Sequence, residues 1–347
     1  MKAIVLEELN QPLEIREVEL TPLKIGQVLV RVLSSGFCGA QLQEIRGHKG
    51  NAKFLPHLMG HEGCGIVESV GDGVSKVKVG DKVVMHWRVA DGIESEFPQY
   101  ILNGKTISSG KVTTLSEFSI VSENRITKIP QDTPADFAAL LGCCISTAFG
   151  VVNNEADIRI GENVAVFGCG GLGLGVILGA KIVGAGRIVG IDIEDEKGQL
   201  ARNIGATSFV NSAKSDLEDA LTDIGISNGF DVVIDTTGIP SVISIGLKIL
   251  SNNGRLVMVA QPEPGKSIEI QNASSFFGTK GKRIISTQGG KTHPHEDIPR
   301  YVNLFQKGNL DYEKIITHRV SMGDINSAVD LLRSGQTGRV IVKIGDE

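Results

Sequence analysis

Polar and apolar residues alternate over several short runs in the first 130 residues, a pattern typical of half-buried β-strands. Gly and Pro residues separate these runs and indicate turns between them. The pattern predicts strands within residues 1–8, 13–20, 27–35, 63–71 and 81–87. We therefore expect a β-rich region at the start of the chain.

At residue 132 the pattern becomes helical. Residues 132–152 predict one helix, with Asp132 or Thr133 as its N-cap and Pro134 in its first turn. This helix is expected to carry the chain from one domain into the next.

After Gly161 strand-like and helix-like segments alternate. The predicted strands lie within residues 163–168, 187–192, 208–211, 231–238 and 255–260, with helices between them. Such alternation specifies a parallel sheet covered by helices on both faces. Residues 283–290 predict the last strand of that sheet, and the mixed helix and strand pattern that follows could return to complete the first domain.

Length and composition fit this two-domain α/β organisation. The chain has 347 residues, of which 41% are hydrophobic and 22% charged, and its 40 acidic residues slightly outnumber its 35 basic ones. Nothing in this balance indicates a nucleic-acid partner. No run of eighteen or more apolar residues predicts a membrane span, and the first residues do not resemble a signal peptide, so we expect a cytoplasmic protein.

The five cysteines form no CxxC pair. Their odd number and wide spacing indicate metal ligands or buried thiols in a reducing compartment, rather than a disulfide framework.

A dinucleotide site is predicted at residues 168–173, where GCGGLG follows a strand and opens a Gly-rich helix. In this motif Gly168 allows a tight turn, Gly170 a close approach of the pyrophosphate, and Gly173 close packing of helix on strand. Asp192 follows at the end of the next strand, 24 residues after Gly168. A carboxylate there binds ribose hydroxyls and repels a 2′-phosphate, and no arginine follows it, so NAD is favoured over NADP.

Three residues with metal-binding side chains precede this turn: Cys38, His61 and Cys143. Two cysteines and a histidine are a known ligand set for catalytic zinc, which keeps its fourth position open. No spacing rule joins these positions, and three separate buried residues are an equal alternative on chemistry alone.

The chain resembles the zinc-dependent medium-chain alcohol dehydrogenases over almost its whole length. The resemblance lies in the segments GFCGA, GHEGCGIV, GDKVV, GCCISTAFG, VFGCGGLG, IVGID and ITHRVSMGDINSAVDLLRSG. It implies a GroES-like catalytic domain, residues 1–145 and 289–347, and a Rossmann NAD-binding domain, residues 146–288.

The resemblance also implies roles for individual residues. Zinc would be bound by Cys38, His61 and Cys143, with Glu62 near the metal as an occasional ligand, while Cys144 fits the family pattern less well and would be a packing residue. The resemblance would also place Thr147 and Leu172 against the nicotinamide, Trp87 in the substrate pocket, Lys197 near the adenosine ribose and Arg339 near the pyrophosphate. The glycine motif itself contributes further cofactor-binding residues, Gly168, Gly170, Gly171 and Gly173, together with Asp192. Ala40 and Gln43 are further expected walls of the substrate pocket. Alternative interpretations are that Trp87 is a core residue and Lys197 a solvated helix residue.

Two departures from the family pattern affect the expected chemistry. The region that carries four cysteines in many relatives contains none here, so we expect one catalytic zinc and no structural zinc. The first ligand is followed by Gly39, Ala40 and Gln41, so the usual proton-relay hydroxyl and the carboxylate that orients the histidine are both missing. The proton would leave through a water chain, through His48, His57 or Glu62, or through a second hydroxyl of the substrate.

The expected function is zinc-dependent hydride transfer between NAD and a small alcohol, polyol, cyclitol or sugar-like compound, with zinc stabilising the alkoxide or polarising the carbonyl. A nucleotide-binding homologue without catalysis, acting as a sensor or interaction protein, is the alternative. A zinc-free quinone or enone reductase is disfavoured by the ligand set. The resemblance further implies a homodimer or homotetramer.

Overall fold

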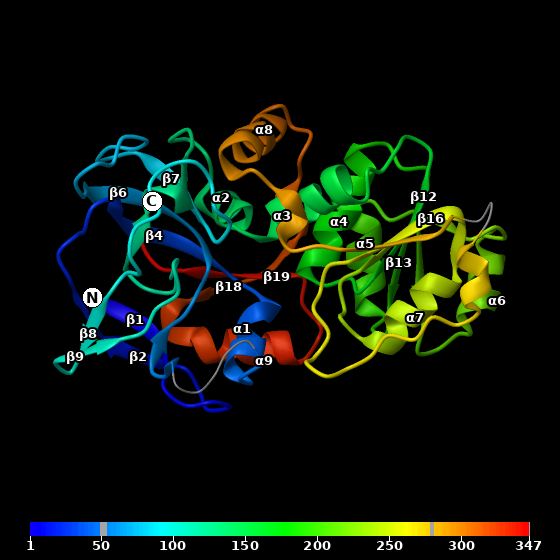
Figure 1. Ribbon diagram of the computed structural model, residues 1–347, viewed down its shortest axis with the longest axis horizontal. Coiled ribbons are helices and arrows are strands. Elements are labelled where there is room, and N and C mark those ends of the chain that lie inside the picture. Colours follow the sequence, from blue (N-terminus) through cyan, green and yellow to red (C-terminus); the bar gives the residue numbers. More distant parts are fainter. Residues whose placement is uncertain (49–53, 278–280, 347) are drawn as a thin grey trace. The chain divides into compact units, whose positions relative to one another are not determined.

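The computed structural model describes residues 1–48, 54–277 and 281–346, which form two compact units (Figure 1). The first unit comprises Met1–Ser146, His293–Ser334 and Arg339–Glu347, and the second comprises Thr147–Thr292 and Gly335–Gly338. The parallel sheet of the second unit and the mixed sheets of the first confirm the predicted α/β fold class.

The first unit is built on a mixed sheet in the order β11-β7-β6-β4-β19-β18, with β10 also paired to β4. Two three-stranded sheets, β2-β1-β5 and β3-β8-β9, complete it. Its strands are β1 (Lys2–Leu6), β2 (Glu14–Glu17), β3 (Glu19–Leu20), β4 (Gln27–Phe37), β5 (His57–Leu58), β6 (Glu62–Val70), β7 (Lys82–His86), β8 (Tyr100–Leu102), β9 (Lys105–Ile107), β10 (Phe118–Ser122), β11 (Ile126–Lys128), β18 (Ile316–Ser321) and β19 (Arg339–Lys343). Its helices include α1 (Gly39–Ile45), α2 (Ala135–Leu141), α8 (Pro294–Gln306) and α9 (Ile325–Arg333).

Strands from the C-terminal segment belong to this sheet. Strand β19 pairs antiparallel with β4, placing Val340 opposite Phe37, and parallel with β18. Apolar residues recur at every second position of β4, and these side chains face the same core. Val28, Val30 and Val32 all belong to one hydrophobic cluster.

The second unit contains a six-stranded parallel sheet in the order β14-β13-β12-β15-β16-β17. This is the Rossmann strand order. The chain adds β13 and β14 on one side of β12 and then returns to add β15, β16 and β17 on its other side. The elements are β12 (Asn163–Phe167), α4 (Gly171–Ile182), β13 (Arg187–Asp192), α5 (Glu196–Ile204), β14 (Ser208–Asn211), α6 (Leu217–Asp223), β15 (Phe230–Asp235), α7 (Pro240–Lys248), β16 (Leu250–Met258) and β17 (Arg283–Ser286).

Helices cover both faces of the parallel sheet. On one face Phe167 and Ile191 share a core cluster with Leu221 of α6 and Ile243 of α7. On the other face Gly190 lies so close to α4 and α5 that an added Cβ would come within 3.3 Å of Ala201. The sheet is therefore buried on both sides, which explains its almost uniformly apolar strands.

The predicted single helix over residues 132–152 is wrong in its continuity. The chain forms α2, breaks at Gly142 and Cys143, and continues as α3 (Cys144–Gly150) and a π-helical turn, η3 (Val151–Glu155). Gly142 packs against β7, since a Cβ there would lie 2.4 Å from the Met85 carbonyl oxygen. The N–H of Cys144 donates to Glu62 Oε2 and not to a carbonyl group of α2, so the helix does not continue.

No single helix in the described residues is long and apolar enough to span a membrane. The two helical segments Ala135–Leu141 and Cys144–Glu155 reach that length and apolar character only when they are taken together, and they are bent by 49°.

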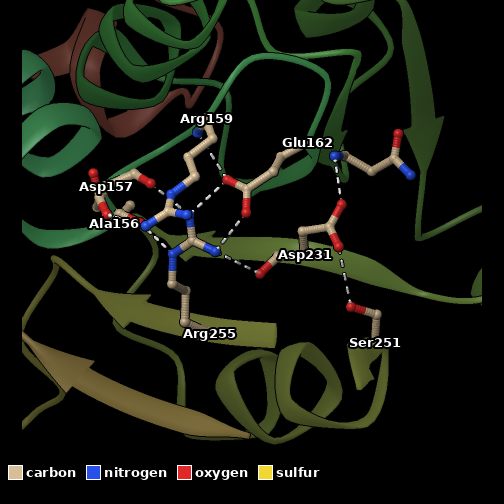
Figure 2. A network of polar contacts seen from close by, with 8 residues as sticks. Ala156, Asp157, Arg159, Glu162, Asp231, Ser251 and Arg255 are labelled. Atoms are coloured by element: carbon tan, nitrogen blue, oxygen red, sulfur yellow. Dashed lines mark hydrogen bonds and ion pairs between the residues drawn. The ribbon is translucent and has the colours of Figure 1, made fainter. Parts of the chain in front are cut away.

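A buried arginine joins strand β16 of the parallel sheet to the chain before β12 (Figure 2). Both terminal nitrogens of Arg255 bond the carboxylate of Glu162, at 2.9 and 2.6 Å. The same guanidinium donates to the carbonyl oxygens of Ala156, Asp157 and Asp231. This network joins β16 to the segment that precedes β12, and it satisfies a charge that is only 7% exposed.

Candidate metal centre and dinucleotide site

Two neighbouring strands and the helix break bring together the three predicted zinc ligands. Cys38 follows β4 and His61 precedes β6, and these strands pair antiparallel at that end, with Ser35 opposite Gly63. Cys143 lies in the break between α2 and α3. The ligand atoms of the three side chains lie within 4.8 Å of one another, and each residue is half-buried.

The pKa values of Cys38 and Cys143, the two candidate thiol ligands, are shifted by a hydrogen bond between them, whereas that of the neighbouring Cys144 is shifted mainly by burial. A hydrogen bond from Cys143, opposed by burial and aided by the charge of Arg339, holds the pKa of Cys38 well below its usual value. The shared hydrogen bond and burial raise the pKa of Cys143. Burial is the main cause of the raised pKa of Cys144, which is only 2% exposed. Two thiols sharing one proton beside an imidazole are chemically suited to a soft divalent metal such as zinc.

Glu62 does not belong to this group of ligand atoms. It is completely buried, and its Oε2 accepts a hydrogen bond of 2.9 Å from the Cys144 N–H. Its Oε1 is paired with the guanidinium of Arg339, the first residue of β19. The carboxylate therefore anchors the helix break and Arg339 in this structure.

Gln41 takes the place of the carboxylate that the sequence lacks. Cys38 is the N-cap of α1, and the Gln41 side chain returns to it, accepting a hydrogen bond of 2.8 Å from the Cys38 N–H through Oε1. The other end of the same amide, Nε2, lies 3.1 Å from Nδ1 of His61. The capping contact is readable from the sequence, because glutamine three residues after an N-cap is typical of a capping box. The contact with His61 depends on strand pairing and was not predicted.

A cavity of about 800 Å³ opens beside the metal-binding group within the first unit. Its wall includes His61 and Trp87, so Trp87 lies where a substrate pocket was predicted, whereas Ala40 and Gln43 do not line this cavity. The lining surface is mainly apolar, although the wall also contains the charged residues Glu44, Lys111 and Arg125. The apolar side chains in the wall include Leu6, Leu9, Phe54, Leu55, Leu58, Phe97, Ile107 and Val112.

The three side chains considered for proton transfer have different surroundings. His57 lines the cavity, and burial lowers the pKa of its imidazole, so the ring is neutral near pH 7. His48 is exposed, and its Nδ1 lies 2.8 Å from Gln43 Oε1. Both carboxylate oxygens of Glu62 are already engaged.

The glycine turn of the second unit has the geometry that its motif predicts. Gly168 has a φ of +85°, in the left-handed region that favours glycine, and Gly170 is the N-cap of α4 with open space where a Cβ would lie. A Cβ on Gly173 would lie 1.8 Å from the Gly168 carbonyl oxygen, so only glycine permits this packing of helix on strand. Gly171 and Leu172 form the first turn of α4, and Leu172 is half-buried.

Asp192 ends β13 beside this turn, and its Oδ2 accepts a hydrogen bond of 2.7 Å from the Cys169 N–H. Its Oδ1 accepts from the N–H groups of the two residues that follow it. Lys197 is 3% exposed and its Nζ donates to the Thr337 carbonyl oxygen, so its interpretation as a solvated helix residue is wrong. Thr147, the first residue of this unit, lies in α3 and is buried.

Comparison with known proteins agrees with these features. Residues 24–131 match the family described as alcohol dehydrogenase GroES-like domain, and residues 171–307 match the zinc-binding dehydrogenase family. Alcohol dehydrogenase 6 of Peromyscus maniculatus is 31% identical over 98% of this chain and 97% of its own.

Solved structures show the same relationship. An alcohol dehydrogenase zinc-binding domain protein from Burkholderia ambifaria has a TM-score of 0.91 at 27% identity, covering 99% of both chains. Benzyl alcohol dehydrogenase from Acinetobacter calcoaceticus has a TM-score of 0.89 at 25% identity, with the same coverage. The chain therefore belongs to the zinc-dependent medium-chain alcohol dehydrogenase family, with its GroES-like and Rossmann-type folds.

Proposed function

We propose that this protein is an NAD-dependent dehydrogenase that binds one catalytic zinc ion through Cys38, His61 and Cys143. The observation that carries the proposal is the convergence of these three ligand atoms within 4.8 Å in a chain of the alcohol dehydrogenase family. When bound, zinc supplies the positive charge that lowers the pKa of an alcohol hydroxyl or polarises a carbonyl. No second group of such residues occurs in the described part of the chain, which supports a single zinc.

NAD is the proposed cofactor because of Asp192. Its carboxylate is fixed beside the glycine turn by three backbone N–H groups, at the place where a Rossmann domain binds the adenosine ribose. A negative charge held there favours two free ribose hydroxyls over a 2′-phosphate. Thr147 and Leu172 are proposed to hold the nicotinamide ring at reacting distance, and Arg339 to bind the pyrophosphate.

The proposed substrate is a primary or secondary alcohol with a sizeable apolar part, or the corresponding carbonyl compound. The cavity beside His61 is large and mostly apolar, and one structural relative is a benzyl alcohol dehydrogenase. Burying an apolar group of the substrate against Trp87 and its neighbours would provide most of the binding free energy. A polyol, cyclitol or sugar-like substrate is the second candidate, because Ala40 supplies no hydroxyl for the proton.

His57 is the proposed acceptor of the hydroxyl proton. It is the one of the three candidate side chains that lines the cavity, and its neutral imidazole can take up a proton. A water chain would connect it to the substrate oxygen where direct contact is not made. A second hydroxyl of the substrate could perform the same task in a polyol.

The experiment is metal analysis of the purified protein, followed by NAD reduction with a panel of aromatic, aliphatic and polyhydroxylated alcohols. We expect about one zinc per chain and faster reduction with aromatic or long-chain alcohols than with polyols. The variant His61→Asn is expected to lose both zinc and activity, while Arg46→Gln, an exposed change at the end of α1, should keep both. Substoichiometric zinc together with no NAD reduction across the panel would favour the non-catalytic homologue.

A further inference from the structure

The side chain of Gln41 is in contact with two of the three proposed zinc ligands at once. Its Oε1 lies 2.8 Å from the backbone nitrogen of Cys38, and its Nε2 lies 3.1 Å from Nδ1 of His61. The side chain is completely buried, so water cannot replace either partner. What each end of the amide can do is therefore set by these two neighbours.

The contact with Cys38 fixes the orientation of the amide. A backbone N–H can only donate a hydrogen bond, so the atom that faces it must be the amide oxygen. The amide nitrogen then faces His61 and donates to Nδ1, which must carry a lone pair. In a neutral imidazole the proton is consequently on Nε2.

This arrangement conflicts with metal binding. Because Nδ1 of His61 is occupied by Gln41, Nε2 is the nitrogen left for a metal, and a metal ligand cannot keep its proton there. Moving the proton to Nδ1 would place an N–H opposite the NH₂ group of Gln41. Turning the amide over would satisfy His61 but would place the NH₂ group opposite the Cys38 N–H.

We propose that Gln41 is a positioning residue whose amide must change partners when the metal binds, giving up the Cys38 N–H to accept from Nδ1 of His61. This inference rests on the proposed zinc-binding function of the three residues. A carboxylate would not face the conflict, since it can accept from both N–H groups at once. Glutamine at this position therefore weakens metal binding relative to glutamate.

The decisive variant is Gln41→Glu, which keeps the length and shape of the side chain and replaces the NH₂ group by an acceptor. We expect its zinc dissociation constant, measured by competition with a chromophoric chelator, to fall about 10-fold to 100-fold, the usual size of effects from partners of metal-binding histidines. The control is Arg46→Gln, which makes the same change in net charge at an exposed position at the end of the same helix. Equal affinities of Gln41→Glu and the wild type, or an equal gain in the control, would overturn the proposal.

A second measurement needs no change at Gln41, and so decides the question if Gln41→Glu does not fold. Nitrogen-15 NMR of histidine-labelled wild-type protein, with the His61 signals assigned by their loss in His61→Asn, reports which ring nitrogen carries the proton. We expect it on Nε2 in the zinc-free protein and on Nδ1 after zinc is added. A proton already on Nδ1 without zinc would contradict the inference. A wild-type protein that binds no zinc would instead refute the proposed function.

Discussion

Two buried arginine–carboxylate pairs, one in each unit, differ in how completely the arginine is satisfied. Arg255 bonds both oxygens of Glu162 and three backbone carbonyl groups (Figure 2). Arg339 is paired with Glu62 and is only 5% exposed, yet its Nε has no hydrogen-bond partner among the described residues. The first pair is a complete network, and the second retains a buried donor.

The difference in hydrogen bonding indicates that Arg255 and Arg339 have different roles. A buried donor without a partner costs free energy, so native proteins rarely keep one unless it binds something else. Arg255 joins β16 to the segment before β12, which is a structural task. The spare donor of Arg339 agrees with its predicted contact with the cofactor phosphates, since a guanidinium fork suits phosphate oxygens.

The largest expected effect comes from removing the complete network. Arg255→Met would remove the guanidinium that donates to the Glu162 carboxylate and to three carbonyl groups, and should lower the free energy of unfolding by about 3 kcal/mol. Urea denaturation followed by circular dichroism measures this loss. The zinc content should stay unchanged, because none of the three proposed ligands belongs to this network.

Arg159→Met is the matched control for that prediction. Arg159 is drawn in the same network but is 78% exposed, and its ion pair with Asp157 lies at the surface. Its loss should change the free energy of unfolding by less than about 0.5 kcal/mol. Equal losses in the two variants would show that completeness of the Arg255 network has no special effect.

The same conservative substitution in both pairs tests the functional side of the comparison. Arg339→Lys keeps the positive charge beside Glu62 but removes the planar fork, so we expect the dissociation constant for NAD to rise about tenfold with little loss of stability. Arg255→Lys should show the reverse, with lower stability and unchanged NAD affinity. Calorimetric titration with NAD and urea denaturation measure the two quantities. If both variants lose only stability, Arg339 has no role in cofactor binding.

Local pattern predicted most of the fold because it decides which face of an element is buried. Strands β4, β12 and β13 and helix α4 lie where alternation and the glycine motif placed them. The helix break before Cys144 was not predicted, since it depends on Glu62, which lies 82 residues earlier in the chain. No local pattern contains that contact.

The metal-binding group shows the same limit. Sequence and resemblance named Cys38, His61 and Cys143, and the pairing of β4 with β6 explains how the first two meet. The contact of Gln41 with His61 is not predicted from the sequence. The family pattern has a carboxylate that orients the histidine, and glutamine at position 41 indicates only that this carboxylate is missing. Only the register of the strands shows that the amide reaches both ligands.

The smallest expected effect concerns the pH dependence of the Arg255 pair. Partial burial raises the pKa of Glu162, but its hydrogen bonds to Arg255 and to the Arg159 N–H lower it more, so the pKa lies below its usual value. A carboxylate with a depressed pKa stabilises the fold above its unfolded-state value of about 4.3, and that contribution is lost as the pH falls through the folded-state pKa. The difference in free energy of unfolding between wild type and Glu162→Gln should therefore shrink as the pH is lowered from about 6 to about 3 in urea titrations. A difference that stays constant over this range would mean that the hydrogen bonds of Glu162, and not its charge, stabilise the network.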